Sequence, residues 1–339
     1  MQGGRGIGFM CAHHLSNQLA QKLVQQTSLP VVGAPLFLIS NPKLVIAQCC
    51  AGIIGSFPAL NAREEEGDPV MLEAWLAEIT EGLDRHNQAH PDRPAAPFAV
   101  NLIVHKSNVR LERDVEILAK WKVPIWITSL GAREFVNDAA HQAGAIVLHD
   151  VIHNRFAKKA IEKGADGLIA VAAGAGGHAG RQSPFALIQE IRSWFAGPLL
   201  LSGAIATGHS ILAARAMGAD MAYIGSPFIA CSEAHADSHY KQMIIDSVAE
   251  DILYTDYFTG VHGNYLRGSI RAQGLDPDNL PDAKSGLDYS SGQSKPKSWK
   301  QIWGAGQGIG VIEKTRPAAE FIDQLRTEYH QAAEQLKKF

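Results

Sequence analysis

From residue 31 onward, short apolar segments alternate with amphipathic segments of helical period, and this alternation constrains the fold more than any other feature. Several apolar segments are hydrophobic at every position, as expected for parallel strands covered on both faces. Eight strand-then-helix units with short connections favour a (β/α)8 TIM barrel, an α/β fold, over an open sheet of six strands. The predicted strands are 31–34, 44–49, 98–104, 124–129, 145–150, 165–173, 197–203 and 221–226.

The composition changes after the eighth predicted strand. Residues 230–313 begin with a helix-like segment and then become rich in Gly, Ser, Pro, Asp and Asn. We interpret them as a smaller, mostly helical insertion that closes over the active site. A final helix over 316–338 is predicted to return to the barrel as its eighth helix. The barrel would then comprise 29–229 and 314–339, with 1–28 as an N-terminal extension.

Charge and hydropathy exclude several classes of partner. The net charge is −3 and the basic residues are scattered, so no nucleic-acid surface is predicted. No apolar run approaches the roughly 18 residues that span a membrane, and no secretory signal is present. The four cysteines, Cys11, Cys49, Cys50 and Cys231, have no CxxC spacing, and Cys49 and Cys50 are expected on opposite faces of the strand 44–49. Reduced thiols in a cytoplasmic protein are therefore expected.

Barrel chemistry lies where strands end and βα loops begin, and two of these loops resemble a phosphate site. Gly203 and Ala204 follow the seventh predicted strand, and Gly225 and Ser226 follow the eighth. These small residues would let backbone N–H groups approach a phosphate, and Ser226 adds a hydroxyl. The alternative is that the glycines only make tight turns.

The stretch "VAAGAGGHAG" at 171–180 allows two interpretations. Gly174 to Ala179 matches G-x-G-x-x-A, the dinucleotide fingerprint, but five β/α units precede it and the next strand ends without the acidic residue that would bind ribose. A second glycine run, at 304–310, follows no strand. We therefore favour a role for His178, since small neighbours would let a planar ligand lie close to an imidazole that titrates near neutral pH.

Metal and nucleophile motifs are absent from the sequence. His235 with His239, and His149 with His153, have an i, i+4 spacing but lack the glutamate of H-E-x-x-H. No H-x-H and no G-x-S-x-G motif occurs. The sequence predicts no metal site and no serine or cysteine nucleophile.

Taken together, these loops resemble those of the nitronate monooxygenase family, formerly called 2-nitropropane dioxygenases, over about residues 29–310. The most specific part is "GADGLIAVAAGAGGHAG", followed by "LLLSGAIATG" and "GADMAYIGSPF". "GAPLF" and "VNLIV" are similar to the family's first-strand and third-strand segments. The resemblance implies a (β/α)8 barrel that holds FMN non-covalently.

The resemblance also implies roles for individual residues. His178 would be the active-site histidine, and Gln307 would face the flavin from the C-terminal glycine-rich loop. Phosphate would be bound by Gly203, Ala204, Gly225 and Ser226. The remaining cofactor contacts would be Ala34, Pro35, Leu36, Asn101, Gly176 and Gly177.

Three departures from the family pattern affect these expectations. Leu36 replaces the usual methionine, a near-isosteric change. Pro227 removes a backbone donor from the phosphate loop. The segment 259–269 differs from that of many members, which leaves the substrate open; His262, Asn264 and Tyr265 are candidate substrate contacts, with a structural loop role as the alternative.

The implied reaction is oxidation of alkyl nitronates, or of nitroalkanes, by O2 to a carbonyl compound and nitrite. One alternative is a flavin oxidoreductase that uses NAD(P)H toward quinones or enoyl thioesters. An alternative of another class is a flavin-free barrel that binds a phosphorylated ligand. The expected partners are a small-molecule substrate and O2, and the oligomeric state is left open.

Overall fold

The computed structural model describes residues 17–63, 70–280 and 299–338. Eight parallel strands form one sheet in the order β1-β9-β8-β6-β5-β4-β3-β2. The two end strands also meet, because the N–H of Gly33 donates to the carbonyl of Ile54 at 2.8 Å and the N–H of Ile54 donates to Val31 at 3.1 Å. The sheet therefore closes, and the predicted (β/α)8 barrel is confirmed. Its strands are β1 Val31–Gly33, β2 Gly55–Pro58, β3 Phe98–Ile103, β4 Ile125–Ser129, β5 Ile146–Val151, β6 Gly167–Val171, β8 Leu199–Ser202 and β9 Met221–Ile224.

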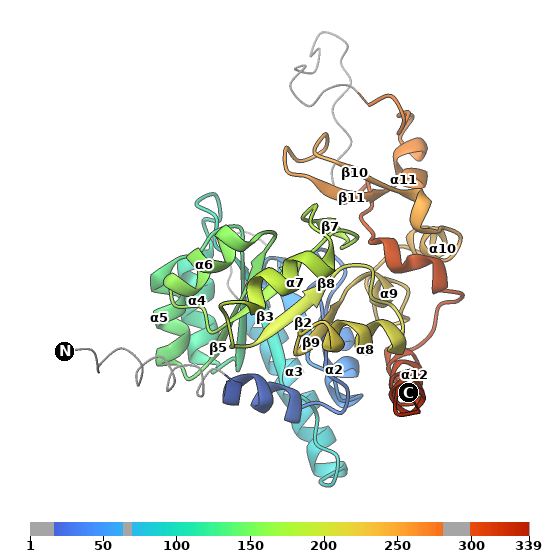
Figure 1. The fold of residues 1–339 in the computed structure, drawn as a ribbon. Helices are drawn as coiled ribbons and strands as arrows, with labels where there is room; N and C mark the ends of the chain where they lie inside the picture. The colour runs from blue at the N-terminus through green and yellow to red at the C-terminus, as the bar shows by residue number, and fades with distance from the viewer. Residues whose placement is uncertain (1–16, 64–69, 281–298, 339) are drawn as a thin grey trace, which may run out of the picture.

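Helices surround the barrel (Figure 1). The last of them, α12, packs between α8 and α2, and the Glu328 carboxylate accepts a hydrogen bond from the N–H of Gly208 at 2.7 Å. It takes the place of the eighth barrel helix, as its sequence predicted. The surrounding helices are α2 Pro42–Cys50, α3 Val70–Ala89, α4 Leu111–Lys120, α5 Glu134–Gln142, α6 Asn154–Glu162, α7 Pro184–Arg192, α8 Gly208–Ala216 and α12 Ala318–Leu336.

The second predicted strand was wrong. Residues 44–49 lie in helix α2, which begins at Pro42 and is capped by the Asn41 side chain accepting from the N–H of Leu44. An Asn-Pro pair is a helix-start signal that outweighs a short apolar run. The second strand of the barrel, β2, is instead "GSFP". Glycine and proline are uncommon inside strands, so its sequence does not predict a strand. Cys49 and Cys50 therefore lie on a helix, with Cys49 buried and Cys50 partly exposed.

Apolar side chains fill the inside of the barrel. Every second residue of a strand points its side chain into the barrel. These inward-facing side chains form one buried cluster, which includes Ala99, Ile127, Leu148 and Tyr223. Leu23, on a helix over residues 17–25, belongs to the same cluster and is 1% exposed. Part of the segment predicted as an N-terminal extension therefore packs against the barrel interior.

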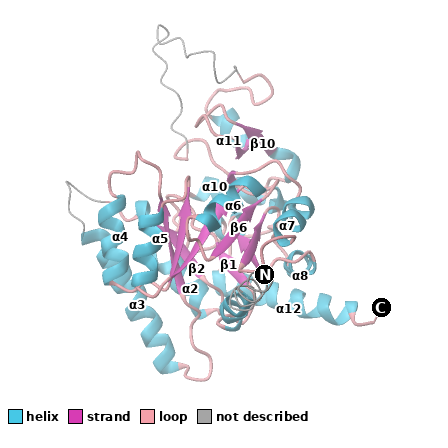
Figure 2. Cartoon of the chain, turned by 60° about the vertical axis from the view of Figure 1, so that its left-hand side comes forward, coloured by secondary structure: helices cyan, strands magenta, loops and turns pink. Residues whose placement is uncertain are grey.

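Beyond the carboxyl end of the barrel, the insertion carries an antiparallel sheet as well as helices (Figure 2). Strands β10 Ile252–Thr255 and β11 Gly263–Leu266 pair with each other, and β11 pairs with β7 Gly177–His178 of the β6 loop. The helices of the insertion are α10 Ser238–Ile245 and α11 Arg267–Ala272, and the short helix α9 Ser226–Ile229 precedes the insertion, directly after β9. The sequence predicted the helices, and the three-stranded sheet is an addition that ties the insertion to the barrel.

Among the helices of the described ranges, none has an apolar stretch long enough to cross a membrane.

Candidate active site

Three glycine-rich loops meet at the carbonyl of Gly174, above the end of β6. This carbonyl accepts from the N–H of Gln307 at 2.9 Å and from the N–H of Ala204 at 3.2 Å. Gly174 has a φ of +85°, and a Cβ there would lie 3.1 Å from Gln307 Oε1 and 3.2 Å from Ala204 Cβ. Glycine is favoured because other residues rarely adopt this backbone conformation and because a Cβ would press on both neighbours. The loop of Gln307, called here the C-terminal glycine loop (304–310), thus lies beside the β6 and β8 loops.

The four predicted phosphate-site residues lie after β8 and β9. Gly203 has a φ of +145° and Ala204 a φ of +54°, so the chain turns sharply and exposes Ala204. Ser226 Oγ accepts from the N–H of Gly306 at 2.8 Å, which joins this loop to the C-terminal glycine loop. Within the described residues, the N–H groups of Gly203, Gly225 and Ser226 donate no hydrogen bond to another residue. They remain available to an anion.

The loop after β1 borders the same region. Ala34, Pro35 and Leu36 are half-buried, and a Cβ on Gly225 would lie 3.3 Å from Leu36 Cδ2 and 3.5 Å from Ala34 Cβ. The N–H of Ala34 donates to the carbonyl of Ile224 at the end of β9. The structure therefore brings the predicted β1 contacts next to the predicted phosphate loop.

His178 lies on β7 and is held by the insertion. Its backbone pairs with Gly263 of β11, and its Nε2 lies 3.1 Å from Thr259 Oγ1. Thr259 Oγ1 donates to the carbonyl of Val261 at 2.9 Å, so it accepts the Nε2 proton of His178. The rings of Trp299 and His178 pack in a T-shaped arrangement, with centroids 5.4 Å apart.

This arrangement defines the proton-bearing atoms of His178. With Nε2 donating to Thr259, the neutral ring carries its lone pair on Nδ1, which has no partner in the described part of the chain and is not sealed from solvent. Burial lowers the pKa of His178 below its usual 6.5. A neutral imidazole with a free Nδ1 can accept a proton.

The three candidate substrate residues have different surroundings. Asn264 is 2% exposed and its Nδ2 donates to the carbonyl of Ala175 at 2.6 Å, which fastens β11 to the β6 loop. Tyr265 is fully buried, with its hydroxyl 3.4 Å from Thr259 Oγ1. His262 stacks on Tyr254, and its Nε2 accepts from Arg181 at 2.7 Å. Asn264 and Tyr265 therefore support the position of His178, and contact of any of the three with substrate stays a prediction.

Asn101 lies at the carboxyl end of β3 and faces the barrel interior. Its Nδ2 donates to Ser129 Oγ at 2.8 Å and to the carbonyl of Ile127 at 3.2 Å. Ser129 in turn donates to the Asp150 carboxylate at 2.5 Å. Sequence reasoning singled out Asn101 but missed Ser129, Asp150, Thr259 and Trp299. For Ser129 and Asp150 the signal was available, because both are polar residues at the end of a predicted barrel strand.

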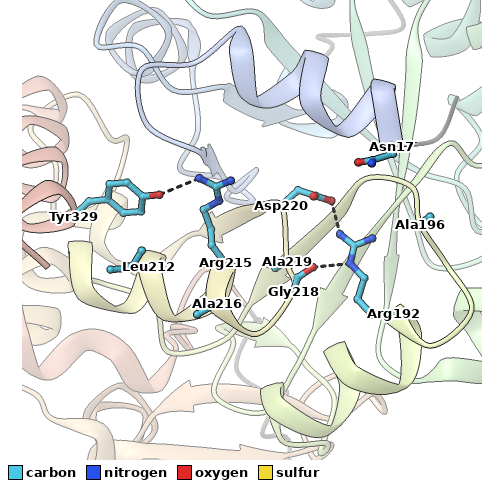
Figure 3. A pocket seen from close by; sticks show the side chains of 10 residues that line it. All are labelled: Asn17, Arg192, Ala196, Leu212, Arg215, Ala216, Gly218, Ala219, Asp220 and Tyr329. Carbon is cyan, nitrogen blue, oxygen red and sulfur yellow. Dashed lines mark hydrogen bonds and ion pairs between the residues drawn. The ribbon is translucent and has the colours of Figure 1, made fainter. Parts of the chain in front are cut away.

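Two of the surface hollows formed by the described residues bear on the search for a ligand site. One, of about 560 Å³, lies at the amino-terminal end of the strands, where the Arg192 guanidinium donates to the Asp220 carboxylate and to the carbonyl of Gly218 (Figure 3). The same guanidinium donates to the carbonyls of Phe195 and Gly197. That network is structural, since each of the three guanidinium nitrogens donates to a protein acceptor. The other hollow, of about 410 Å³, lies between the loops after β1, β2 and β3, at the end of the barrel that carries His178; it is lined by Phe37, Leu60, Arg63 and Arg110.

Across residues 17–63, 70–280 and 299–338, no three His, Cys, Asp or Glu side chains are grouped closely enough to hold a metal ion. His149, one of the i, i+4 histidines, is buried on the outer side of the sheet with Nδ1 2.6 Å from Thr128 Oγ1, and burial lowers its pKa to about 4.

Comparisons with known proteins agree with this architecture. A family model described as nitronate monooxygenase matches residues 19–328. The nitronate monooxygenase of Paraburkholderia phytofirmans is 24% identical over 352 residues, covering 91% of this chain and 94% of that protein. The nitronate monooxygenase of Pseudomonas aeruginosa is 26% identical over 336 residues, covering 87% of this chain and 95% of that protein.

Two solved structures are similar in fold. FabK from Thermotoga maritima has a TM-score of 0.75 and 23% identity, covering 94% of this chain and 98% of that one. A nitroalkane oxidase from Streptomyces ansochromogenes has a TM-score of 0.72 and 22% identity, covering 92% and 99%. At such identities the likeness concerns the barrel fold. The family model, however, spans most of the chain, and the chain therefore belongs to the nitronate monooxygenase family of flavin-dependent oxidoreductases.

Proposed function

We propose that this chain is an FMN-dependent enzyme that oxidises alkyl nitronates with O2, yielding a carbonyl compound and nitrite. Membership of the family supports the reaction class. The observation that carries the proposal is the position of His178 among glycines at the end of a barrel strand. Its Nε2 is bonded to Thr259, and its Nδ1 has no partner among the residues that the structure describes.

The residues present fit FMN. The unpaired N–H groups of Gly203, Gly225 and Ser226 suit a phosphate group. Gly176 is exposed, and no side chain could be added there because a Cβ would lie 2.9 Å from the N–H nitrogen of Gly306. A bare backbone of this kind allows a flat ring to approach closely. The half-buried Leu36 supplies apolar surface beside Gly225.

When bound, FMN would supply the electron acceptor for the substrate carbanion. The protein's own residues orient the substrate and handle its proton. For a neutral nitroalkane, Nδ1 of His178 would remove the proton on the carbon that carries the nitro group, and Thr259 would hold the ring by its Nε2 proton. For a preformed nitronate no proton needs to be removed. Trp299 packs against the imidazole of His178, and Tyr265 packs against Trp299.

Anaerobic reduction of the purified yellow protein tests the proposal. Propionate-3-nitronate should bleach the flavin absorbance, NADH and NADPH should not, and admitting O2 should then release nitrite. Rapid bleaching by NAD(P)H without bleaching by the nitronate would overturn the proposal in favour of a flavin reductase. A colourless protein that gains no flavin absorbance after FMN is added would favour a flavin-free barrel.

A further inference from the structure

A row of three polar side chains lies at the carboxyl end of the barrel interior. Asn101, Ser129 and Asp150 come from the neighbouring strands β3, β4 and β5. Each stands two residues after a member of the buried interior cluster, namely Ala99, Ile127 and Leu148. Since side chains on a strand alternate between its two faces, all three point into the barrel, one step closer to the active-site loops.

The hydrogen bonds along this row have a defined direction. An ionised Asp150 can only accept, so Ser129 donates its one proton to Asp150 Oδ2 at 2.5 Å. Ser129 Oγ then accepts from Asn101 Nδ2 at 2.8 Å. The second N–H of that amide goes to the carbonyl of Ile127, which can only accept. Both amide protons of Asn101 are thus used within the barrel wall.

The side-chain oxygen of Asn101, Oδ1, is the acceptor that the row itself does not use. Oδ1 has no hydrogen-bond partner among the residues that the structure describes, and it is not sealed from solvent. Because the amide cannot turn without losing both donor contacts, Oδ1 stays presented to the end of the barrel where the loops of the candidate active site lie. A fixed acceptor there would accept a hydrogen bond from a ligand N–H.

Asp150 itself is unusual for an interior carboxyl group. Its Oδ1 is shielded from solvent and has no partner within the described ranges. Burial raises the pKa of this carboxyl to about 6, against the opposing effect of the hydrogen bond from Ser129. Among the described titratable groups, the hydroxyl of Tyr223 on β9 interacts with this carboxyl. Burial, and to a smaller extent the negative charge of Asp150, raises the pKa of Tyr223 well above 10. No cation of the described chain contributes to the shift.

We propose that Asp150 is a positioning residue, which acts through Ser129 to hold the Asn101 amide with its Oδ1 facing the flavin. This inference rests on the proposed function, because it concerns the same cofactor site. The carboxylate draws the Ser129 proton toward itself, and Ser129 Oγ can then receive Asn101. When Asp150 becomes protonated, Ser129 is free to turn and the amide loses its fixed orientation. The flavin environment should therefore respond to pH as Asp150 titrates.

Ser129→Ala tests this proposal, since it removes the link between Asp150 and Asn101 while barely changing the shape of the barrel. The measurements are the Kd of FMN for the apoprotein and the visible spectrum of the bound flavin from pH 5 to pH 8. In the wild type we expect the spectrum to titrate near pH 6. In Ser129→Ala we expect the titration to be lost and FMN to bind about three- to tenfold more weakly at pH 7.5, the loss typical of one hydrogen bond.

Companion variants separate charge from hydrogen bonding. Asp150→Asn mimics the protonated carboxyl at every pH, so the spectral titration should disappear and FMN should bind at pH 7.5 as weakly as the wild type binds it at pH 5. Asp150→Leu removes the acceptor and should weaken FMN binding as Ser129→Ala does. Ser129→Thr retains the hydroxyl and should behave like the wild type. Asp138→Asn, on an exposed position of α5, is the matched control and should change neither readout.

Two results would overturn the proposal. One is a Ser129→Ala protein that binds FMN as the wild type does. The other is a spectral titration that persists in Ser129→Ala but vanishes in Asp150→Asn, because Asp150 would then act on the flavin directly. A wild-type protein that binds no FMN would refute the proposed function itself, so the two failures are distinguishable.

Discussion

The imidazole of His178 and the hydroxyl of Thr259 come from distant parts of the chain, and His178 Nε2 lies 3.1 Å from Thr259 Oγ1. The histidine belongs to the β6 loop of the barrel, whereas Thr259 belongs to the insertion. The bond assigns the proton of the neutral ring to Nε2 and the lone pair to Nδ1. The insertion thus sets the protonation geometry of a barrel residue, and several expectations follow from that.

Replacing His178 by Asn should separate the two substrate types. We expect turnover of neutral nitroethane to fall by roughly 10²- to 10⁴-fold, the usual effect of losing a general base. Turnover of preformed ethyl nitronate should fall far less, because it needs no proton removed. Initial rates of nitrite release from both substrates, with FMN content measured in each preparation, check the result. Equal losses on both substrates would refute the role of His178 as a base.

With neutral nitroethane as substrate, activity should be lost at a lower pH than an ordinary histidine would give. The unprotonated imidazole is the active form, so activity is lost as the pH falls through the pKa of His178. Burial lowers that pKa below 6.5, so the midpoint of the decline in kcat/KM should lie below pH 6.5. A decline centred above pH 6.5 would contradict the depressed pKa. Thr259→Val, which removes the partner of Nε2, should change this profile.

Asn264→Ala should loosen the insertion from the barrel. The buried Asn264 amide donates to the carbonyl of Ala175 at 2.6 Å, and its removal leaves that acceptor unpaired. We expect the free energy of unfolding to fall by about 1–3 kcal/mol, measured by urea titration. Gln242→Ala, at an exposed position of α10, is the control and should change it little. If both variants unfold at the same urea concentration, Asn264 does not fasten β11.

Gly176→Ala should disturb the glycine loops. The added Cβ would lie 2.9 Å from the backbone nitrogen of Gly306 and 3.1 Å from Ser226 Oγ, so the C-terminal glycine loop must move. We expect FMN to bind at least fivefold more weakly, a cost of about 1 kcal/mol. Gly310→Ala is a matched control in the same loop, because its Cβ would meet no atom closer than 3.7 Å. Equal FMN affinity in the two variants would show that the close contact of the Gly176 loop with the C-terminal glycine loop does not matter for FMN binding.

Some of the site could be predicted because its residues occupy recognisable positions in the chain. Gly203, Gly225 and His178 each follow an apolar strand, and barrel strands present their ends to one common face. Side-chain partners are harder to predict. His178 and Thr259 are 81 residues apart in the chain, and no local pattern links them. Ser129 and Asp150 stand at predicted strand ends, yet their contact depends on the register between β4 and β5.

The alternation of apolar strands and amphipathic helices, read from the sequence by itself, determined the barrel, the returning helix α12 and the loops that carry the chemistry. Hydrophobic periodicity is a local property, and it reports which face of an element is buried. Only the tertiary structure decided that residues 44–49 are helical, that β11 pairs with His178, and that Asn101, Ser129 and Asp150 form one row. Those outcomes depend on helix capping, strand register and barrel closure, which arise when distant segments meet and compete for the same hydrogen-bonding groups.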